Sequence, residues 1–222
     1  MMRIISLTIF SILFSSAVAN ADSTNIGLKV SYGNMEASGS HTTNSGSIAY
    51  GGTAVSASGD ADFPFGSIFI ERQISAGSMD VALGLDINPT TQKVDKLGGG
   101  DGFDATVDMG NLYTAYIQPM FASNGNVTLF AKLGYSQADL DIKDITRQAT
   151  TAGTASTDGN TSKSLEGPMY GIGVNVSLES SFVRLEATRI DFDEISHTNS
   201  NGKVLKADSE LDAISISFGK SF

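Results

Sequence analysis

The sequence predicts an all-β fold: a transmembrane antiparallel up-and-down β-barrel of about eight strands, with long external loops and short periplasmic turns. Three observations predict it. The chain begins with an export signal, apolar residues alternate with small or polar ones in eight separate segments, and short and long connections alternate between those segments.

The first element is a signal peptide over residues 1–21. It starts with Met-Met-Arg, continues with an apolar stretch over 4–19 and ends in Ala19-Asn20-Ala21. A basic start, a short apolar centre and an Ala-x-Ala exit are typical of secretory signals, so we expect cleavage before Asp22 and a barrel domain over 22–222. The alternative is a retained anchoring helix, but the apolar stretch is shorter than the roughly 20 residues that span a bilayer.

The strand segments follow. The alternation is clearest in 26–32, 81–87, 127–135 and 170–178, and weaker in 66–74, 105–119, 182–192 and 211–222. Side chains of a strand point to opposite faces in turn, so each segment has one apolar and one polar face. Most of these segments are close to the roughly 9–11 residues that a tilted strand needs to cross a membrane.

The connections are of two kinds that alternate along the chain. Short turns are predicted at 75–78, 122–125 and 179–181, and long polar loops at 34–62, 89–104, 138–164 and 193–210. Membrane barrels have this asymmetry, whereas a soluble barrel has no reason for it. Proline lacks the N–H group that a central strand needs, so the four prolines are expected at or beyond strand ends: Pro64, Pro89, Pro119 and Pro168.

Which face of the strands meets lipid is ambiguous from the alternation alone. A soluble barrel hides its apolar face inside, and a membrane barrel turns it outward. Tyr32, Tyr135 and Tyr170 fall near the loop ends of their segments. Tyrosine favours the headgroup level of a bilayer, so this placement favours the membrane barrel.

Six charged residues fall on the polar face, three of each sign: Lys29, Glu71, Asp86, Lys132, Arg184 and Glu186. An isolated buried ion costs several kcal/mol, so these groups are expected to pair or to stay hydrated. A barrel of about eight strands is just wide enough for side chains to fill. We therefore expect an ion-paired plug in the lumen. The alternative is that some of these residues lie outside the membrane depth and are hydrated.

The C-terminal residues Ile214, Ile216, Phe218 and Phe222 alternate and end on an aromatic ring, with Lys220 as a departure. They resemble the terminal strand of bacterial outer-membrane proteins, and 183–189 is similar to the penultimate strand. The mature chain resembles the small OmpA/OmpX-like outer-membrane barrel family. The resemblance implies an outer-membrane location, a terminal strand that serves as the assembly signal, and a lumen without an open channel.

The resemblance also implies partners: outer-membrane lipids, lipopolysaccharide, and the barrel-assembly machinery with periplasmic chaperones. We expect a monomer. The net charge of −10 argues against nucleic acid, whose phosphates bind basic surfaces. The chain has no cysteine, so it forms no disulfide.

No catalytic residue, cofactor site or metal site is predicted. The two histidines, His41 and His197, fall in predicted external loops. The region of His197 resembles the His/Ser/acid sets of outer-membrane lipid A deacylases, but its spacing does not match them. The segment 98–104, with Asp95 and Asp108 nearby, faintly resembles one Ca²⁺-binding nonapeptide turn, but such turns bind ions in stacked repeats. A solvated acidic loop is the simpler interpretation.

Taken together, the sequence predicts a protein with a structural, envelope-integrity or surface-interaction role exerted through external loops. A small-solute porin-like channel is the alternative. An outer-membrane lipid-modifying enzyme is a further alternative.

Overall fold

The structure, a computed structural model of the chain, describes residues 23–43, 55–76, 79–99, 103–122, 125–147, 157–158, 161–198 and 203–222. Ten strands account for nearly all of them: β1 (Ser23–Thr43), β2 (Val55–Ala76), β3 (Met79–Asn88), β4 (Gln92–Gly99), β5 (Phe103–Ala122), β6 (Val127–Arg147), β7 (Thr157–Asp158), β8 (Thr161–Leu178), β9 (Ser181–Thr198) and β10 (Lys203–Ser221). Within these ranges, no helix has the length and hydropathy of a membrane-spanning segment.

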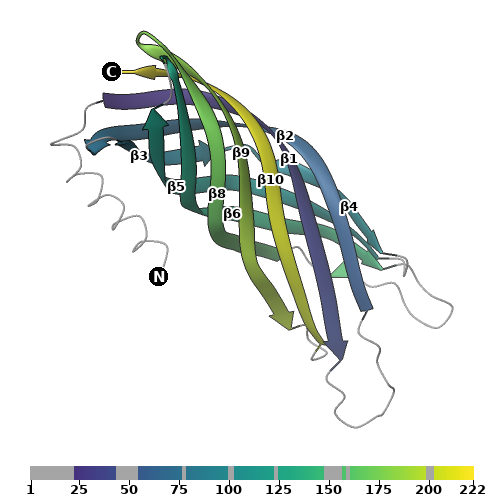
Figure 1. Cartoon of the computed structure of the whole chain (residues 1–222). Helices are drawn as coiled ribbons and strands as arrows, with labels where there is room; N and C mark the ends of the chain where they lie inside the picture. The colour runs from purple at the N-terminus through teal and green to yellow at the C-terminus, as the bar shows by residue number, and fades with distance from the viewer. Residues whose placement is uncertain are drawn as a thin grey trace.

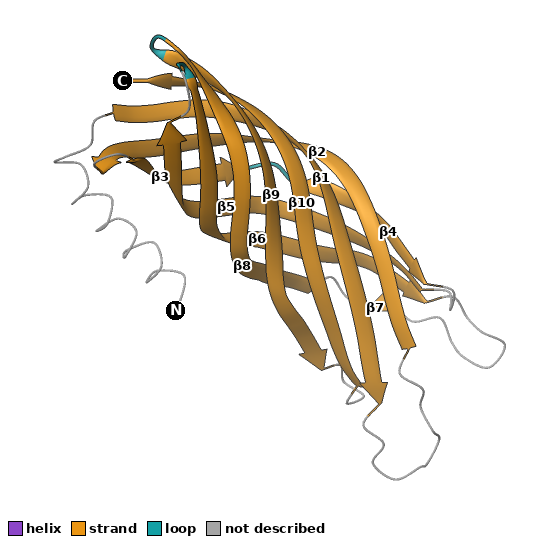
Figure 2. Ribbon diagram, in the orientation of Figure 1, coloured by secondary structure: helices purple, strands orange, loops and turns teal. Residues whose placement is uncertain are grey.

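Eight of the strands form a closed antiparallel barrel. The order around it is β1-β2-β3-β5-β6-β8-β9-β10, and β10 pairs back onto β1. In Figure 1 the purple first strand and the yellow last strand lie side by side. The two remaining strands, β4 and β7, pair with β5 and β6. Figure 2 shows that the described chain is strand nearly throughout. The predicted all-β barrel is confirmed.

One end of the barrel, which we call the turn end, carries the short connections. Consecutive strands meet there at Ala76/Met79 and at Leu178/Ser181. The barrel also closes there, because the backbone N–H groups of Thr24 and Phe222 each donate to the other residue's carbonyl, at 3.0 and 2.9 Å. We call the opposite end the loop end.

A belt of exposed apolar side chains surrounds the half of the barrel nearer the turn end. Leu28, Ile172 and Ile214 have exposed fractions of 63%, 68% and 72%. Four exposed tyrosines lie toward the loop end of this belt: Tyr32, Tyr113, Tyr135 and Tyr170. An apolar outer surface with a tyrosine girdle is the surface of a membrane barrel. The structure thus resolves the ambiguity that the alternation left.

Beyond the tyrosines, the apolar face of the barrel strands changes sides, except in β3, which ends at Asn88. On β1, Leu28 and Tyr32 point outward and Lys29 faces the lumen, but farther along Glu36 is exposed and Met35 is buried in the lumen. The outer face of β1 is therefore apolar in the half nearer the turn end, where it suits lipid, and polar in the other half, where it suits water.

This change of sides explains why the predicted loop bounds were wrong. Residues 34–62, 89–104, 138–164 and 193–210 were predicted as loops, but strands extend into all four ranges. β1 continues to Thr43 and β2 already begins at Val55. Alternation persists in these extensions with its phase reversed, so a search for one continuous apolar face ends too early.

The prediction for proline was also wrong at three positions. Pro64, Pro119 and Pro168 lie inside β2, β5 and β8, and only Pro89 follows a strand end. The ladder of β2 with β3 begins at Ile68, and that of β8 with β9 stops at Met169. At Pro64 and at Pro168 the strand is therefore hydrogen-bonded to a neighbouring strand on one side and has no ladder partner on the other. A strand tolerates proline at such a position, because no N–H group is needed on the unpaired side.

Candidate functional site in the lumen

The site that the fold builds is the lumen itself, which is filled by inward side chains in successive layers. On β9 the inward residues run from the turn end as Phe182, Arg184, Glu186, Thr188 and Ile190. Aromatic and charged groups thus come first, then a hydroxyl, then apolar groups. We call the set Lys29, Glu71, Asp86, Lys132, Arg184 and Glu186 the ion layer.

Arg184 of β9 and Glu71 of β2 form the central pair of the ion layer. Arg184 Nη1 donates to Glu71 Oε1 at 2.6 Å, and Nη2 donates to Oε2 at 3.0 Å. The Tyr116 hydroxyl donates to Oε1 at 2.7 Å and the Asn25 amide to Oε2 at 3.4 Å. The exposed fractions are 0% for Glu71 and 2% for Arg184. A two-pronged pair with further donors is the geometry that stabilises buried opposite charges.

Three aromatic rings surround the guanidinium of Arg184. Its central carbon lies 5.0, 5.1 and 5.4 Å from the ring centroids of Phe182, Phe130 and Phe69. Aromatic faces attract a cation, and a planar guanidinium stacks on them better than an ammonium does. The rings therefore stabilise an arginine here in a way that lysine does not reproduce.

Each ring near the central pair lies against a glycine on a neighbouring strand. The register pairs are Gly27 with Phe69, Gly219 with Phe182, Gly173 with Phe130 and Gly84 with Tyr116. A Cβ atom at any of these glycines would collide with its partner's ring. Such glycine–aromatic pairs cover the bare backbone and pin the register of a sheet. Our sequence reasoning missed them, although both members fall on the polar face of their segments.

The other four charges form a second group. Lys29 pairs with Asp86 and, at 3.2 Å, with Glu186, and Lys132 pairs with the second oxygen of Glu186. The Lys132 ammonium lies 4.3 Å from the centroid of the Tyr116 ring, which joins the two groups. The structure thus brings all six sequence-predicted lumen residues together, each with an opposite charge.

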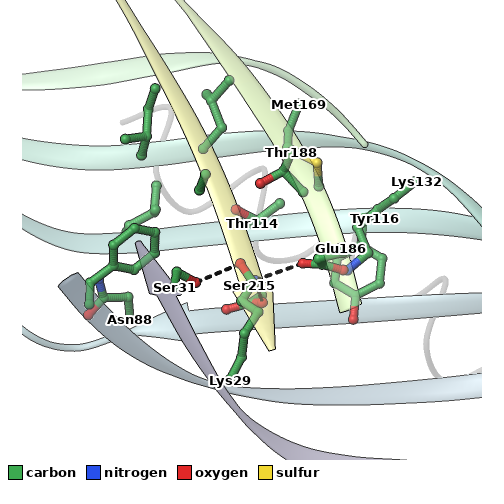
Figure 3. A pocket seen from close by; sticks show the side chains of 16 residues that line it. Lys29, Ser31, Asn88, Thr114, Tyr116, Lys132, Met169, Glu186, Thr188 and Ser215 are labelled. Atoms are coloured by element: carbon green, nitrogen blue, oxygen red, sulfur yellow. Dashed lines mark hydrogen bonds and ion pairs between the residues drawn. The ribbon is translucent and has the colours of Figure 1, made fainter. Parts of the chain in front are cut away.

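A layer of hydroxyl groups lies between the ion layer and the loop end. Ser31 and Ser215 are hydrogen-bonded at 2.8 Å, and so are Thr114 and Ser136. Figure 3 shows Ser31 and Ser215 beside a small cavity that Lys29 also lines. The cavity measures about 30 Å³, which gives room for about one or two water molecules.

Above the hydroxyl groups most inward side chains are apolar, and Asn88 of β3 is a buried polar exception. We call the apolar set the apolar layer; its buried members are Met35, Phe63, Phe65, Met109, Leu112, Tyr116, Ala138, Leu140, Leu165, Met169, Ile190, Phe192, Leu211 and Ala213. They form one contiguous cluster, and none has an exposed fraction above 8%. Our sequence reasoning predicted only a polar lumen. The apolar layer consists of the inward residues beyond the change of sides, and the reversed alternation was the signal that would have found it.

The comparisons with known proteins agree with this architecture. The model of the outer membrane protein beta-barrel domain family matches residues 5–222. The chain belongs to this family. Its members are bacterial outer-membrane barrels, and the predicted outer-membrane location follows from membership. No curated protein matches the sequence.

Solved outer-membrane barrels are similar to this chain at low sequence identity. OprG from Pseudomonas aeruginosa is 14% identical with a TM-score of 0.56, over 91% of this chain and 97% of that chain. The protease OmpT from Escherichia coli is 10% identical with a TM-score of 0.47, over 91% and 97%. Ail, the attachment invasion locus protein of Yersinia pestis, is 11% identical with a TM-score of 0.45, over 91% and 99%. The similarity to OprG supports the barrel fold.

The two histidines lie in strands, so their predicted placement in loops was wrong. His41 belongs to β1 and His197 to β9, and both pair in register with Leu205 of β10. Their side chains lie outside the described residues.

The acidic segment 98–104, predicted as a loop, lies mostly in the hairpin that β4 and β5 form. β4 ends at Gly99 and β5 begins at Phe103, with 100–102 outside the described residues. Asp108 is a buried residue of β5. Within the described ranges, no group of three His, Cys, Asp or Glu residues is arranged to hold a metal ion.

The structure describes the predicted assembly signal at the C-terminus but not the predicted signal-peptide cleavage site. Ile214, Ile216, Phe218 and Phe222 are exposed on the outer surface or at the turn end, with exposed fractions between 53% and 72%. The predicted signal-peptide cleavage site at Ala19 and Ala21 lies outside the described residues.

Proposed function

We propose that this family member is a sealed, non-catalytic barrel that supports the integrity of the outer membrane and presents its loop end for interactions at the cell surface. One observation carries the proposal: the lumen is filled by side chains, first with paired charges and then with apolar groups. A steady aqueous path needs a continuous column of water. The cavity between the two layers has room for only about one or two water molecules, far fewer than a continuous column needs.

The size of the barrel supports the same proposal. An interior of eight strands is just wide enough for side chains, whereas aqueous channels are a feature of barrels with about sixteen strands. The ion layer has three positive and three negative groups, so it presents no net charge that would attract one kind of ion.

The interaction role is supported by the length of the strands. β1 continues from the girdle residue Tyr32 to Thr43, which is about 35 Å along the strand at about 3.3 Å per residue. The outer face of this extension is polar, with Asn34, Glu36 and Ser38 following Tyr32. A rigid wall projecting past the lipid is suited to contact lipopolysaccharide or another surface. We include the lipid, lipopolysaccharide and assembly-machinery partners, and the monomeric state, in the proposal.

Two measurements test it. Purified protein in planar lipid bilayers should show no steady conductance at a protein load at which a sixteen-stranded porin conducts. A deletion strain should become more sensitive to detergents and to large antibiotics, and the wild-type gene should restore resistance. Large, stable wild-type channels would reject the sealed barrel and favour the small-solute channel. An unchanged permeability barrier in the deletion strain would reject the integrity role.

A further inference from the structure

We propose that the apolar layer, and not the ion layer, is the barrier that closes the lumen toward the cell exterior. The inference rests on the proposed sealed barrel and assigns the seal to particular residues. It makes the ion pairs a structural support whose loss does not by itself open a path.

The order of the layers puts the apolar residues between the ion layer and the loop end. Strands β1 and β9 place the same kinds of residue in the same order, and β10 between them follows its inward serines, Ser217 and Ser215, with Ala213 and Leu211. From the turn end, β1 presents Lys29, then Ser31, then Met35 to the lumen, and β9 ends its series with Ile190 and Phe192. Any ion that passes between the exterior and the ion layer must first cross the apolar layer.

The apolar layer is one contiguous cluster to which most of the barrel strands contribute. Its buried members come from seven of the eight barrel strands, all except β3, among the described residues. Met35 and Leu211 come from one wall, and Leu140 and Leu165 from the opposite one. A contiguous apolar constriction excludes water, and an ion cannot enter it without losing its hydration shell.

The ion layer differs from the apolar layer because the groups around its central pair are polar. Removal of the Arg184–Glu71 pair would leave polar neighbours, among them Asn25 and the Tyr116 hydroxyl, that water can hydrate. Such a variant gains water in the half of the lumen near the turn end. We expect no path, because no residue of the apolar layer is substituted and only Tyr116 among its members loses a hydrogen bond.

The absence of cysteine from the chain makes a labelling test clean. Ser31 lies between the two layers, is 3% exposed, and is bonded only to Ser215 in the described hydrogen bonds. A Ser31→Cys variant therefore places one thiol between the two layers. A small, charged, membrane-impermeant thiol reagent is applied to intact cells, and separately to the periplasmic side.

Three backgrounds are compared. The first is otherwise wild type, the second carries Arg184→Ala with Glu71→Ala, and the third carries Met35→Ser with Leu211→Ser. We expect external labelling to rise about tenfold or more only in the third background, and periplasmic labelling to rise in the second. Steady conductance in planar bilayers should appear only when the second and third sets are combined.

Folding is checked by the mobility of unboiled protein on gels. If the Met35/Leu211 variant does not assemble, Leu140→Ser with Leu165→Ser perturbs the same layer from the opposite wall. Glu36→Ser is the matched control, because Glu36 is the outward neighbour of Met35 and should leave external labelling unchanged.

The outcomes separate the two proposals. External labelling or conductance in the Arg184/Glu71 variant alone, with a closed wild type, would overturn the assignment of the seal and leave the sealed barrel intact. Conductance of the wild type itself would overturn the sealed barrel. Labelling that stays low in both apolar-layer variants after correct assembly would also overturn the assignment.

Discussion

Replacement of Arg184 by alanine is the sharpest test of the ion layer as a structural support. The substitution removes both hydrogen bonds to the Glu71 carboxylate and empties the space between three aromatic rings. Glu71 then remains fully buried, with only Tyr116 and Asn25 as donors. A buried charge without its counter-ion is strongly unfavourable, so the barrel should lose stability.

The size of the effect follows from burial. Removing one partner of a buried ion pair costs about 3–5 kcal/mol of the free energy of unfolding. Arg189 provides a matched control on the same strand, because it also forms an ion pair, with Asp212. That pair has exposed fractions of 40% and 46%, and a surface pair contributes about 0–1 kcal/mol. Arg184→Ala should therefore cost several times more than Arg189→Ala.

The assay is unfolding in urea in lipid vesicles, followed by the loss of the fast-migrating band on unboiled gels and by circular dichroism. Tryptophan fluorescence is not an option, because the chain has no tryptophan. A double variant, Arg184→Met with Glu71→Leu, should recover much of the lost stability because no unpaired charge remains. Equal losses for Arg184→Ala and Arg189→Ala would refute the reasoning and indicate a hydrated ion layer.

N-terminal sequencing of protein from outer membranes should begin at Asp22; a sequence that begins at Met1 would contradict the signal peptide. The hydrogen bond from Arg189 lowers the pKa of the Asp212 carboxyl, so the stability that this pair contributes is present above the ordinary carboxyl pKa of about 4 and is lost as the pH falls through the lowered pKa. The difference in unfolding free energy between wild type and Asp212→Asn should shrink accordingly below about pH 4, and a difference that grows in acid would reject this. Deletion of Phe222 should lower the yield of heat-modifiable barrel in membranes, whereas His197→Ala should not; equal yields would make the terminal resemblance superficial.

Local features of the sequence were sufficient to predict the strands and the hairpins of the turn end. Strand periodicity is a property of each segment by itself, so the belt residues such as Leu28 and Ile172 could be predicted without knowing any partner strand. The same alternation predicted that the six charged residues lie on the polar face of their strands, toward the lumen. Their pairing partners could not be predicted, because Arg184 and Glu71 are 113 residues apart and meet only when the barrel has closed.

The glycine–aromatic pairs show the same limit. Gly219 and Phe182 are recognisable as a pair only once the register of β10 against β9 is known. Register is a long-range property that depends on the whole sheet. Residues on the polar face of a segment are visible in the sequence, but the ring that covers each glycine is not.

The change of sides and the two kinds of lumen filling have one physical cause. Where the outer surface meets lipid, the hydrophobic effect gives no reason to bury apolar side chains inside, so the interior is held by hydrogen bonds and ion pairs such as Arg184–Glu71. Beyond Tyr32 the outer surface meets water, and apolar residues such as Met35 and Leu211 are most stable inside. A strand that crosses both surroundings must therefore reverse its alternation at the membrane boundary. It follows that the driest part of the lumen lies outside the lipid, at the level where the barrel wall is surrounded by water.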